Sequence, residues 1–153
     1  MLRALKDIFE KLVATATEPA PAEQQSALNL ATAVLLVEVM RANPAKTAVE
    51  RQAVVLMLQQ RLQLNGAALT QLMRQAEQSA ASAYDYQRFT TRLNGLCTQA
   101  QKIQIVQDMW QVAYADGQLG AVENSVINQM AGLLHVTHGE YIAAKMHAKE
   151  AVA

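Results

Sequence analysis

Apolar residues recur along most of the chain at intervals of three and four, the spacing of one face of an α-helix. Residues 2–14 show this pattern: leucine, isoleucine, phenylalanine and valine side chains share one face, and charged side chains occupy the other. No stretch alternates apolar and polar residues as a half-buried strand does. The pattern therefore predicts an all-α fold, a single helical domain of about seven to eight helices.

Helix-breaking residues set the limits of these elements. Pro19 and Pro21 cannot continue a helix, so residues 17–22 are expected to form a linker. The linker separates an N-terminal amphipathic helix within residues 1–16 from a helical domain at residues 23–150. We expect the first helix to dock on the core of that domain; the alternatives are partner binding or peripheral membrane contact through residues 2–14. The predicted helices cover residues 2–14, 23–42, 47–62, 67–80, 84–94, 98–115, 120–134 and 137–148.

The second half of the chain repeats the first. Val49-Glu50 matches Val122-Glu123, 73 residues later, and the turns fall at the same interval. The two repeats cover about residues 28–80 and 101–150, and each would leave an apolar face exposed by itself. We therefore expect two pseudo-symmetric helix–turn–helix units that pack into one core. Further matches at the same interval are Val39 with Val112, Val54 with Ile127 and Met57 with Met130.

Composition narrows the classes of partner. Apolar residues make up 52% of the chain and charged residues 17%, and the formal net charge is zero. A chain without a basic excess lacks what phosphate neutralisation requires, so no nucleic-acid partner is expected. Few charges and a zero balance permit association with a protein partner or with a second copy.

Cysteine use and hydropathy bear on location. Cys97 is the one cysteine, so no disulfide can form within the chain, which fits a reducing compartment. Because apolar residues lie next to it, we expect Cys97 to act as a small, half-buried apolar side chain. Charged residues interrupt residues 2–14, so these do not read as a secretory signal. The longest apolar run, residues 31–37, is far shorter than the ~20 residues that span a bilayer. We expect a cytoplasmic protein that is not integral to a membrane.

The turn after the helix at 98–115 carries the most suggestive chemistry. Asp116 and Gly117 end that helix, and Glu123 follows six residues after the glycine, as in an EF-hand loop. The comparison fails further upstream, because Val112 and Tyr114 would stand where that loop needs oxygen ligands. The turn is therefore not an EF-hand.

Two interpretations of this turn stay open. The first is helix capping: Thr47 and Glu50 form a capping-box pattern, and Gly120 and Glu123 occupy the matching positions. The second is a divalent-cation site on Asp116 and Glu123. The first repeat weakens the second interpretation, because Asn43-Pro44 stands there in place of Asp-Gly.

Other polar residues have structural interpretations. Glu38, in an apolar stretch, is expected to pair with Arg41 one turn later. Thr137 and Glu140 form another capping-box pattern. No phosphate-binding loop, nucleophile elbow or catalytic carboxylate pair occurs, so we expect no enzymatic activity. His135, His138 and His147 lack the spacing of a zinc site, and Trp110, Tyr84 and Tyr86 are expected to pack between helices.

Several segments, in matching order and spacing, resemble the TerB-like (tellurite-resistance) family over about residues 23–148. Residues 112–117 with Glu123 resemble its signature, and residues 35–42 resemble its other repeat. Residues 1–6 and 86–90 are similar to an uncharacterised bacterial subgroup of the family. The remaining matching positions are Ile127, Leu133 and Leu134.

The resemblance implies an all-helical, pseudo-symmetric domain associated with tellurite resistance and stress, of which a relative occurs in a membrane-anchored bacterial co-chaperone. It also implies divalent-metal binding in some members through acidic turn residues. That role would fall here on Asp116 and Glu123, with Glu50 a weaker candidate. Fold and family do not fix function, so the expectation remains a non-enzymatic interaction or scaffold module, with a divalent-metal-binding or metal-responsive domain as the alternative.

Overall fold

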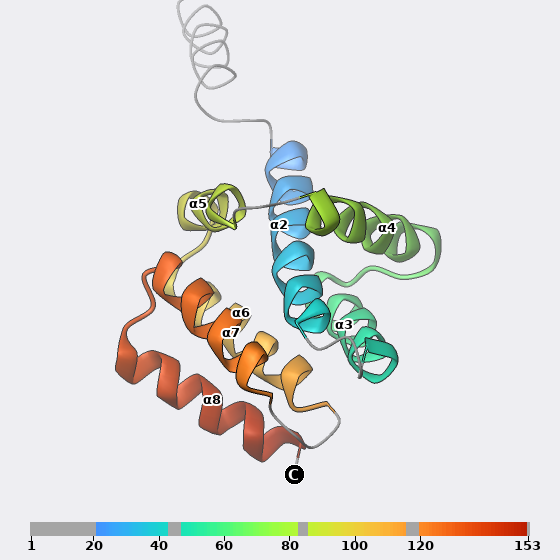
Figure 1. The fold of residues 1–153 in the computed structure, drawn as a ribbon. Coiled ribbons are helices and arrows are strands. Elements are labelled where there is room, and N and C mark those ends of the chain that lie inside the picture. Colours follow the sequence, from blue (N-terminus) through green and yellow to red (C-terminus); the bar gives the residue numbers. More distant parts are fainter. Residues whose placement is uncertain (1–20, 43–46, 83–85, 116–119, 153) are drawn as a thin grey trace, which may run out of the picture.

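A computed structural model of the chain describes residues 21–42, 47–82, 86–115 and 120–152 (Figure 1). Within these ranges the structure has seven α-helices and no strand. The predicted all-α fold is therefore confirmed. The predicted helix at residues 2–14 lies outside the described residues. The described helices are α2 (Pro21–Arg41), α3 (Thr47–Leu62), α4 (Gly66–Ser82), α5 (Gln87–Leu96), α6 (Gln99–Ala113), α7 (Ala121–Leu133) and α8 (His138–Val152).

Helix α2 forms the centre of the molecule and contacts α3, α4, α5, α6 and α7 (Figure 1). Every residue from 31 to 40 is buried, because neighbours cover the helix on all sides. The segment is apolar around its circumference, as a fully buried helix requires, apart from Thr32 and Glu38. The continuous apolar run seen in the sequence is thus a core helix.

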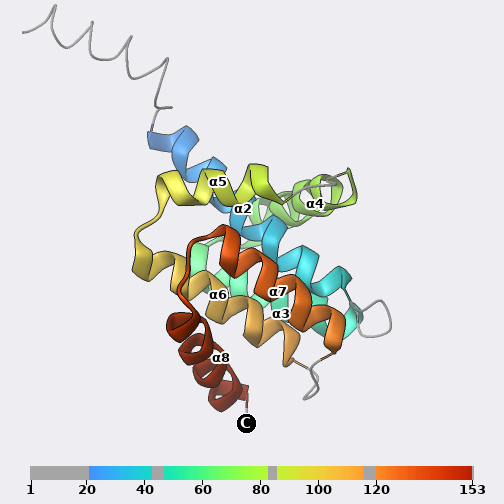
Figure 2. The same ribbon diagram turned by 60° about the vertical axis from the view of Figure 1, so that its left-hand side comes forward.

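The two repeats recur as three-helix units, α2–α3–α4 and α6–α7–α8. In each unit the first helix contacts both of the others, and α2 contacts α6 to join the units. Figures 1 and 2 show α8 at the edge of the molecule beside α6. Residues 73 apart also share their burial: Val54 and Ile127 are both 0% exposed, and Met57 and Met130 are both buried. The repeat seen in the sequence is therefore a repeat of packing.

Some helix limits differ from those predicted. Helix α2 begins at Pro21, inside the predicted linker, because proline suits the first turn of a helix, where its missing N–H is not needed. Helix α5 continues through Gly95 to Leu96, although Asn94-Gly95 was expected to end it. Asn94 instead donates a hydrogen bond from Nδ2 to the carbonyl of Leu133, which fixes α5 beside the end of α7.

Two capping boxes hold the starts of α6 and α8. The hydroxyl of Thr98 accepts from the backbone N–H of Gln101, whose side chain accepts from the N–H of Thr98. Thr137 and Glu140 make the same exchange, at 3.2 and 2.9 Å, so the second box is as predicted. Gln99 also donates to Glu140 Oε1 and links the two helix starts.

Over the residues that the structure describes, no helix is long and apolar enough to cross a membrane.

Candidate functional site

The first turns of α3 and α7 carry the two glutamates that the sequence singled out. Glu50 and Glu123 are both 0% exposed. The preceding residues, Val49 and Val122, point the other way and are 50% and 60% exposed. Each repeat thus places a valine outside and a glutamate inside at the same position. In Figures 1 and 2, the starts of α3 and α7 lie toward the end of the molecule where α2 finishes.

Helix capping accounts for only part of this arrangement. Gly120 is the N-cap of α7, as the capping interpretation expects, and Glu123 is in the first turn, where a carboxylate favours the helix dipole. Gly120 has no side chain to complete a capping box, and α7 has no side-chain cap bond. Helix α3 begins at Thr47, whose side chain is not among those described, so the expected box with Glu50 stays a prediction. Complete burial of both carboxylates is a feature that capping alone did not predict.

The third candidate ligand of the predicted cation site, Asp116, lies outside the described residues. Among the residues described, no group of three or more His, Cys, Asp or Glu side chains is placed to hold a metal ion. His135, His138 and His147 are exposed, and the ring of His138 stacks on Tyr141 at 6.2 Å between centroids. The cation site on Asp116, Glu123 and Glu50 therefore stays a prediction.

Glu38 has two partners. Arg41 donates from Nη1 to Oε1 at 3.0 Å, which confirms the predicted pair. Tyr86, directly before α5, donates from its hydroxyl to Oε2 at 3.0 Å, a contact that the sequence did not predict. Burial and the adjacent Glu38 carboxylate raise the pKa of the Tyr86 hydroxyl. Glu38 thus connects the end of α2 to the start of α5.

Asp108 on α6 carries a further buried carboxylate, whose role the sequence did not predict. Its side chain is 2% exposed and accepts from Arg61 Nε at 3.0 and 3.1 Å. Gln104 Nε2 donates a further bond to Oδ1 at 2.9 Å. Burial raises the pKa of Asp108, although the bonds from Arg61 and Gln104 act in the opposite direction. A signal for burial was present, because Asp108 lies one helical turn after the apolar Ile105.

The ion pair of Arg61 and Asp108 lies in the wall of a cavity of about 260 Å³ between α2, α3 and α6. Its lining combines apolar side chains with a threonine, three glutamines and the ion pair. Cys97, which follows α5, also lines the cavity, and burial raises the pKa of its thiol. The lining residues are Gln25, Leu28, Thr32, Arg61, Leu62, Cys97, Gln101, Gln104, Ile105 and Asp108.

An aromatic cluster joins α6 to α8. Trp110 is 0% exposed, stacks on Tyr114 at 6.1 Å and meets Tyr141 edge-on at 5.4 Å between ring centroids. Lys145 Nζ lies 4.9 Å from the centroid of the Trp110 ring, within range of a cation–π contact. The predicted packing role of Trp110 is confirmed, and the contacts explain how α8 is held on α6.

Comparison with known proteins identifies a family. A family model described as "Tellurite resistance protein TerB" matches residues 29–146, most of the chain, including α3 to α7 and parts of α2 and α8. No curated protein and no solved structure matches the chain.

Proposed function

We propose that the chain, which belongs to the TerB family of tellurite resistance proteins, is a non-enzymatic module. It binds a protein partner through the first turns of α3 and α7. The partner is a polypeptide that presents apolar side chains. The chain's low share of charged residues, 17%, and its zero net charge favour an apolar contact over an ionic one.

The repeated exposure of Val49 and Val122 carries the proposal. A single exposed aliphatic side chain on a protein surface needs no explanation. Here the exposed valine occurs at the same position of both repeats, 50% and 60% exposed, beside a completely buried glutamate. In each first turn a buried glutamate follows an exposed valine, so both repeats turn the same side of this helical turn outward.

The test compares two double variants in native lysate and then with the purified partner. Val49→Ser plus Val122→Ser removes the proposed contact. Ile142→Ser plus Met146→Ser, at 41% and 52% exposure on α8, is the matched control. We expect the first variant to weaken binding of the identified partner at least about tenfold, a loss of roughly 1.4 kcal/mol, and the control to bind normally.

Three results would count against this function. The first is that no partner is captured reproducibly. The second is that both double variants lose the partner equally. The third is that the wild-type chain forms a dimer which the valine variant separates on light-scattering chromatography; the occupant of the surface would then be a second copy rather than another protein.

A divalent-cation site on Asp116, Glu123 and Glu50 is the second candidate, favoured by the burial of two of these carboxylates. Burying a carboxylate is unfavourable unless charge or hydrogen bonds compensate it, and a cation would contribute such charge. A cation that binds there should raise the melting temperature, and calcium, magnesium and zinc are the ions to test. At a concentration one hundred times Kd, the free energy of unfolding should increase by about 2.7 kcal/mol.

The double variant Asp116→Asn plus Glu123→Gln should lose the metal-dependent rise in melting temperature. Glu140→Gln, at the start of α8, should keep that rise. Glu140 is a suitable control because it also lies in the first turn of a helix but belongs to a capping box. An unchanged melting temperature with all three metals, or an equal shift in both variants, would exclude the cation site.

A further inference from the structure

We propose that the cavity between α2, α3 and α6 is a binding site for a small organic carboxylate, whose carboxylate group is held by Arg61 and whose apolar body lies against Leu28, Leu62 and Ile105. This site is separate from the first turns of α3 and α7, and it does not depend on the protein-binding function.

The hydrogen bonding of Arg61 indicates the class of ligand. Both of its bonds to Asp108 use Nε, at 3.0 and 3.1 Å. A guanidinium group carries five donors in a planar fork, so the Nη1 and Nη2 edge is left for another acceptor. Two parallel N–H donors match the two oxygens of a carboxylate. The Arg61 side chain is 40% exposed, which leaves this edge accessible.

Asp108 prepares this arginine for a ligand. Its side chain is 2% exposed and accepts a further bond from Gln104, so it is a fixed part of the wall. By binding Nε, it removes rotational freedom from the Arg61 side chain before any ligand arrives, which lowers the cost of binding. We therefore assign Asp108 as a positioning residue and Arg61 as the ligand-binding residue.

Two cations, Arg61 and Lys102, lie in or near the cavity wall. Arg61 and Asp108 balance each other within the lining. Lys102, a buried residue on α6, acts electrostatically on Cys97 in the wall and lowers the pKa of its thiol, against the larger effect of burial. Lys102 Nζ donates to Asn94 Oδ1 at 3.2 Å, which holds the ammonium group at this side of the molecule. Lys102 also acts electrostatically on the Glu140 carboxylate, so the free donors of Arg61, rather than a net positive charge, are what attract a carboxylate.

Size and lining set the rest of the ligand. The volume of about 260 Å³ is slightly below that of most ligand pockets, which measure roughly 300–1,000 Å³. A branched aliphatic or single-ring acid is therefore the right scale. Leu28, Leu62 and Ile105 supply apolar contact, and the amide groups of Gln25 and Gln101 can bind a polar substituent.

The experiment titrates the isotope-labelled full-length chain with 4-methylpentanoate, and separately with the neutral 4-methylpentanamide, and follows backbone amide signals by NMR. We expect the acid to shift the signals of Thr32, Cys97 and Ile105 saturably, with a Kd on the order of 1–10 mM for so small a probe. The amide should bind about tenfold more weakly, because it cannot form the charged fork. No saturable shift with the acid, or equal binding of acid and amide, would overturn the proposal.

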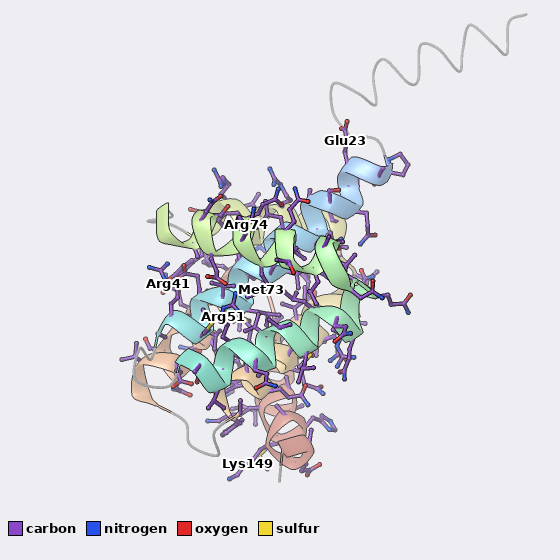
Figure 3. All side chains as sticks on the ribbon, turned by 90° about the vertical axis from the view of Figure 1, so that its right-hand side faces the viewer. Glu23, Arg41, Arg51, Met73, Arg74 and Lys149 are labelled. Atoms are coloured by element: carbon purple, nitrogen blue, oxygen red, sulfur yellow. The ribbon has the colours of Figure 1, made fainter. Side chains whose placement is uncertain are left out.

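Two variants and a control locate the site. Arg61→Met should weaken binding of the acid at least about tenfold. Arg51→Met is the matched control, because Arg51 is also on α3 (Figure 3). It pairs with Glu77 of α4 at 2.9 Å and does not line the cavity. Leu28→Trp fills the cavity and keeps the ion pair, so it tests the site even if Arg61→Met does not fold. Unchanged binding in Leu28→Trp, or equal loss in both arginine variants, would place the probe elsewhere and refute the site.

Discussion

Asp108 on α6 accepts hydrogen bonds at 3.0 and 3.1 Å from Arg61, which lies on α3, 47 residues earlier in the chain. The pair therefore connects the two repeats, because α3 belongs to the first three-helix unit and α6 to the second. Asp108 is almost fully buried, whereas Arg61 is 40% exposed. Removing the arginine should therefore lower stability more than neutralising the carboxylate, because it leaves the buried charge of Asp108 without its cation.

Arg61→Met should lower the free energy of unfolding by about 1–3 kcal/mol, less than for a fully buried pair because water reaches the arginine. The loss arises because Asp108 keeps its buried charge without its cation. The double variant Arg61→Met plus Asp108→Asn should recover part of it. Denaturant titration of the variants measures this, and a double variant no more stable than Arg61→Met would contradict the explanation.

Stability should depend on pH through Asp108 in a defined direction. Its pKa in the folded protein is raised above the ordinary value of 3.8, chiefly by burial. Between these two values the folded state binds more protons than the unfolded state, so the free energy of unfolding falls as pH rises through this interval. The stabilising contribution of protonated Asp108 is fully present at pH values below its pKa in the unfolded chain. It is lost once the pH exceeds its pKa in the folded protein.

The difference between wild type and Asp108→Asn isolates this effect from other carboxyls, such as Glu140, whose lowered pKa acts in the opposite direction. Hydrogen bonds from Thr137 and Gln99 to Glu140 are the cause of that lowering. Chemical denaturation at several pH values from acid to neutral should show the wild type losing stability relative to Asp108→Asn as pH rises. A constant difference would show that Asp108 titrates normally.

Tyr86→Phe should destabilise the protein by about 1–2 kcal/mol, because it removes the hydroxyl donor from the buried Glu38 carboxylate. Tyr114→Phe is the control: its ring stacks on Trp110, and the substitution keeps that contact. We expect a change within about 0.5 kcal/mol for the control. Equal thermal stability of the two variants would show that the bond to Glu38 contributes little.

The repeat makes a prediction about matched positions. Val54→Ala and Ile127→Ala remove buried aliphatic groups from equivalent core sites and should each cost about 1.5–4 kcal/mol. Val49→Ala and Val122→Ala, at the exposed equivalent pair, should change stability by no more than about 0.5 kcal/mol. Urea titrations of the four variants test this; a cost at Val122 comparable to that at Ile127 would contradict the assigned orientation of the first turn.

Local patterns in the sequence predicted most of the fold. The apolar spacing gave the correct limits of α3 and limits within a few residues for the other described helices, and the 73-residue interval predicted matching burial in the two repeats. The Glu38 pair with Arg41 was predictable because the two residues are three apart on one helix. Interactions of this kind depend on helical geometry alone.

Contacts between distant segments were not predictable in the same way. Arg61 reaches Asp108, and Tyr86 reaches Glu38, only because the packing of helices brings α3 to α6 and α2 to α5. The cavity depends on three helices at once, so no local pattern encodes it. The burial of Glu50 and Glu123 also escaped prediction, since a glutamate in a first helical turn is usually explained by capping.

Hydrogen exchange of the chain alone and in complex with its purified partner tests the proposed function most directly. We predict slower exchange in the first turns of both α3 and α7, around Val49 and Val122. Exchange should be unchanged on the exposed face of α8 around Ile142 and Met146. Protection confined to α8, or to any surface without both valines, would contradict it.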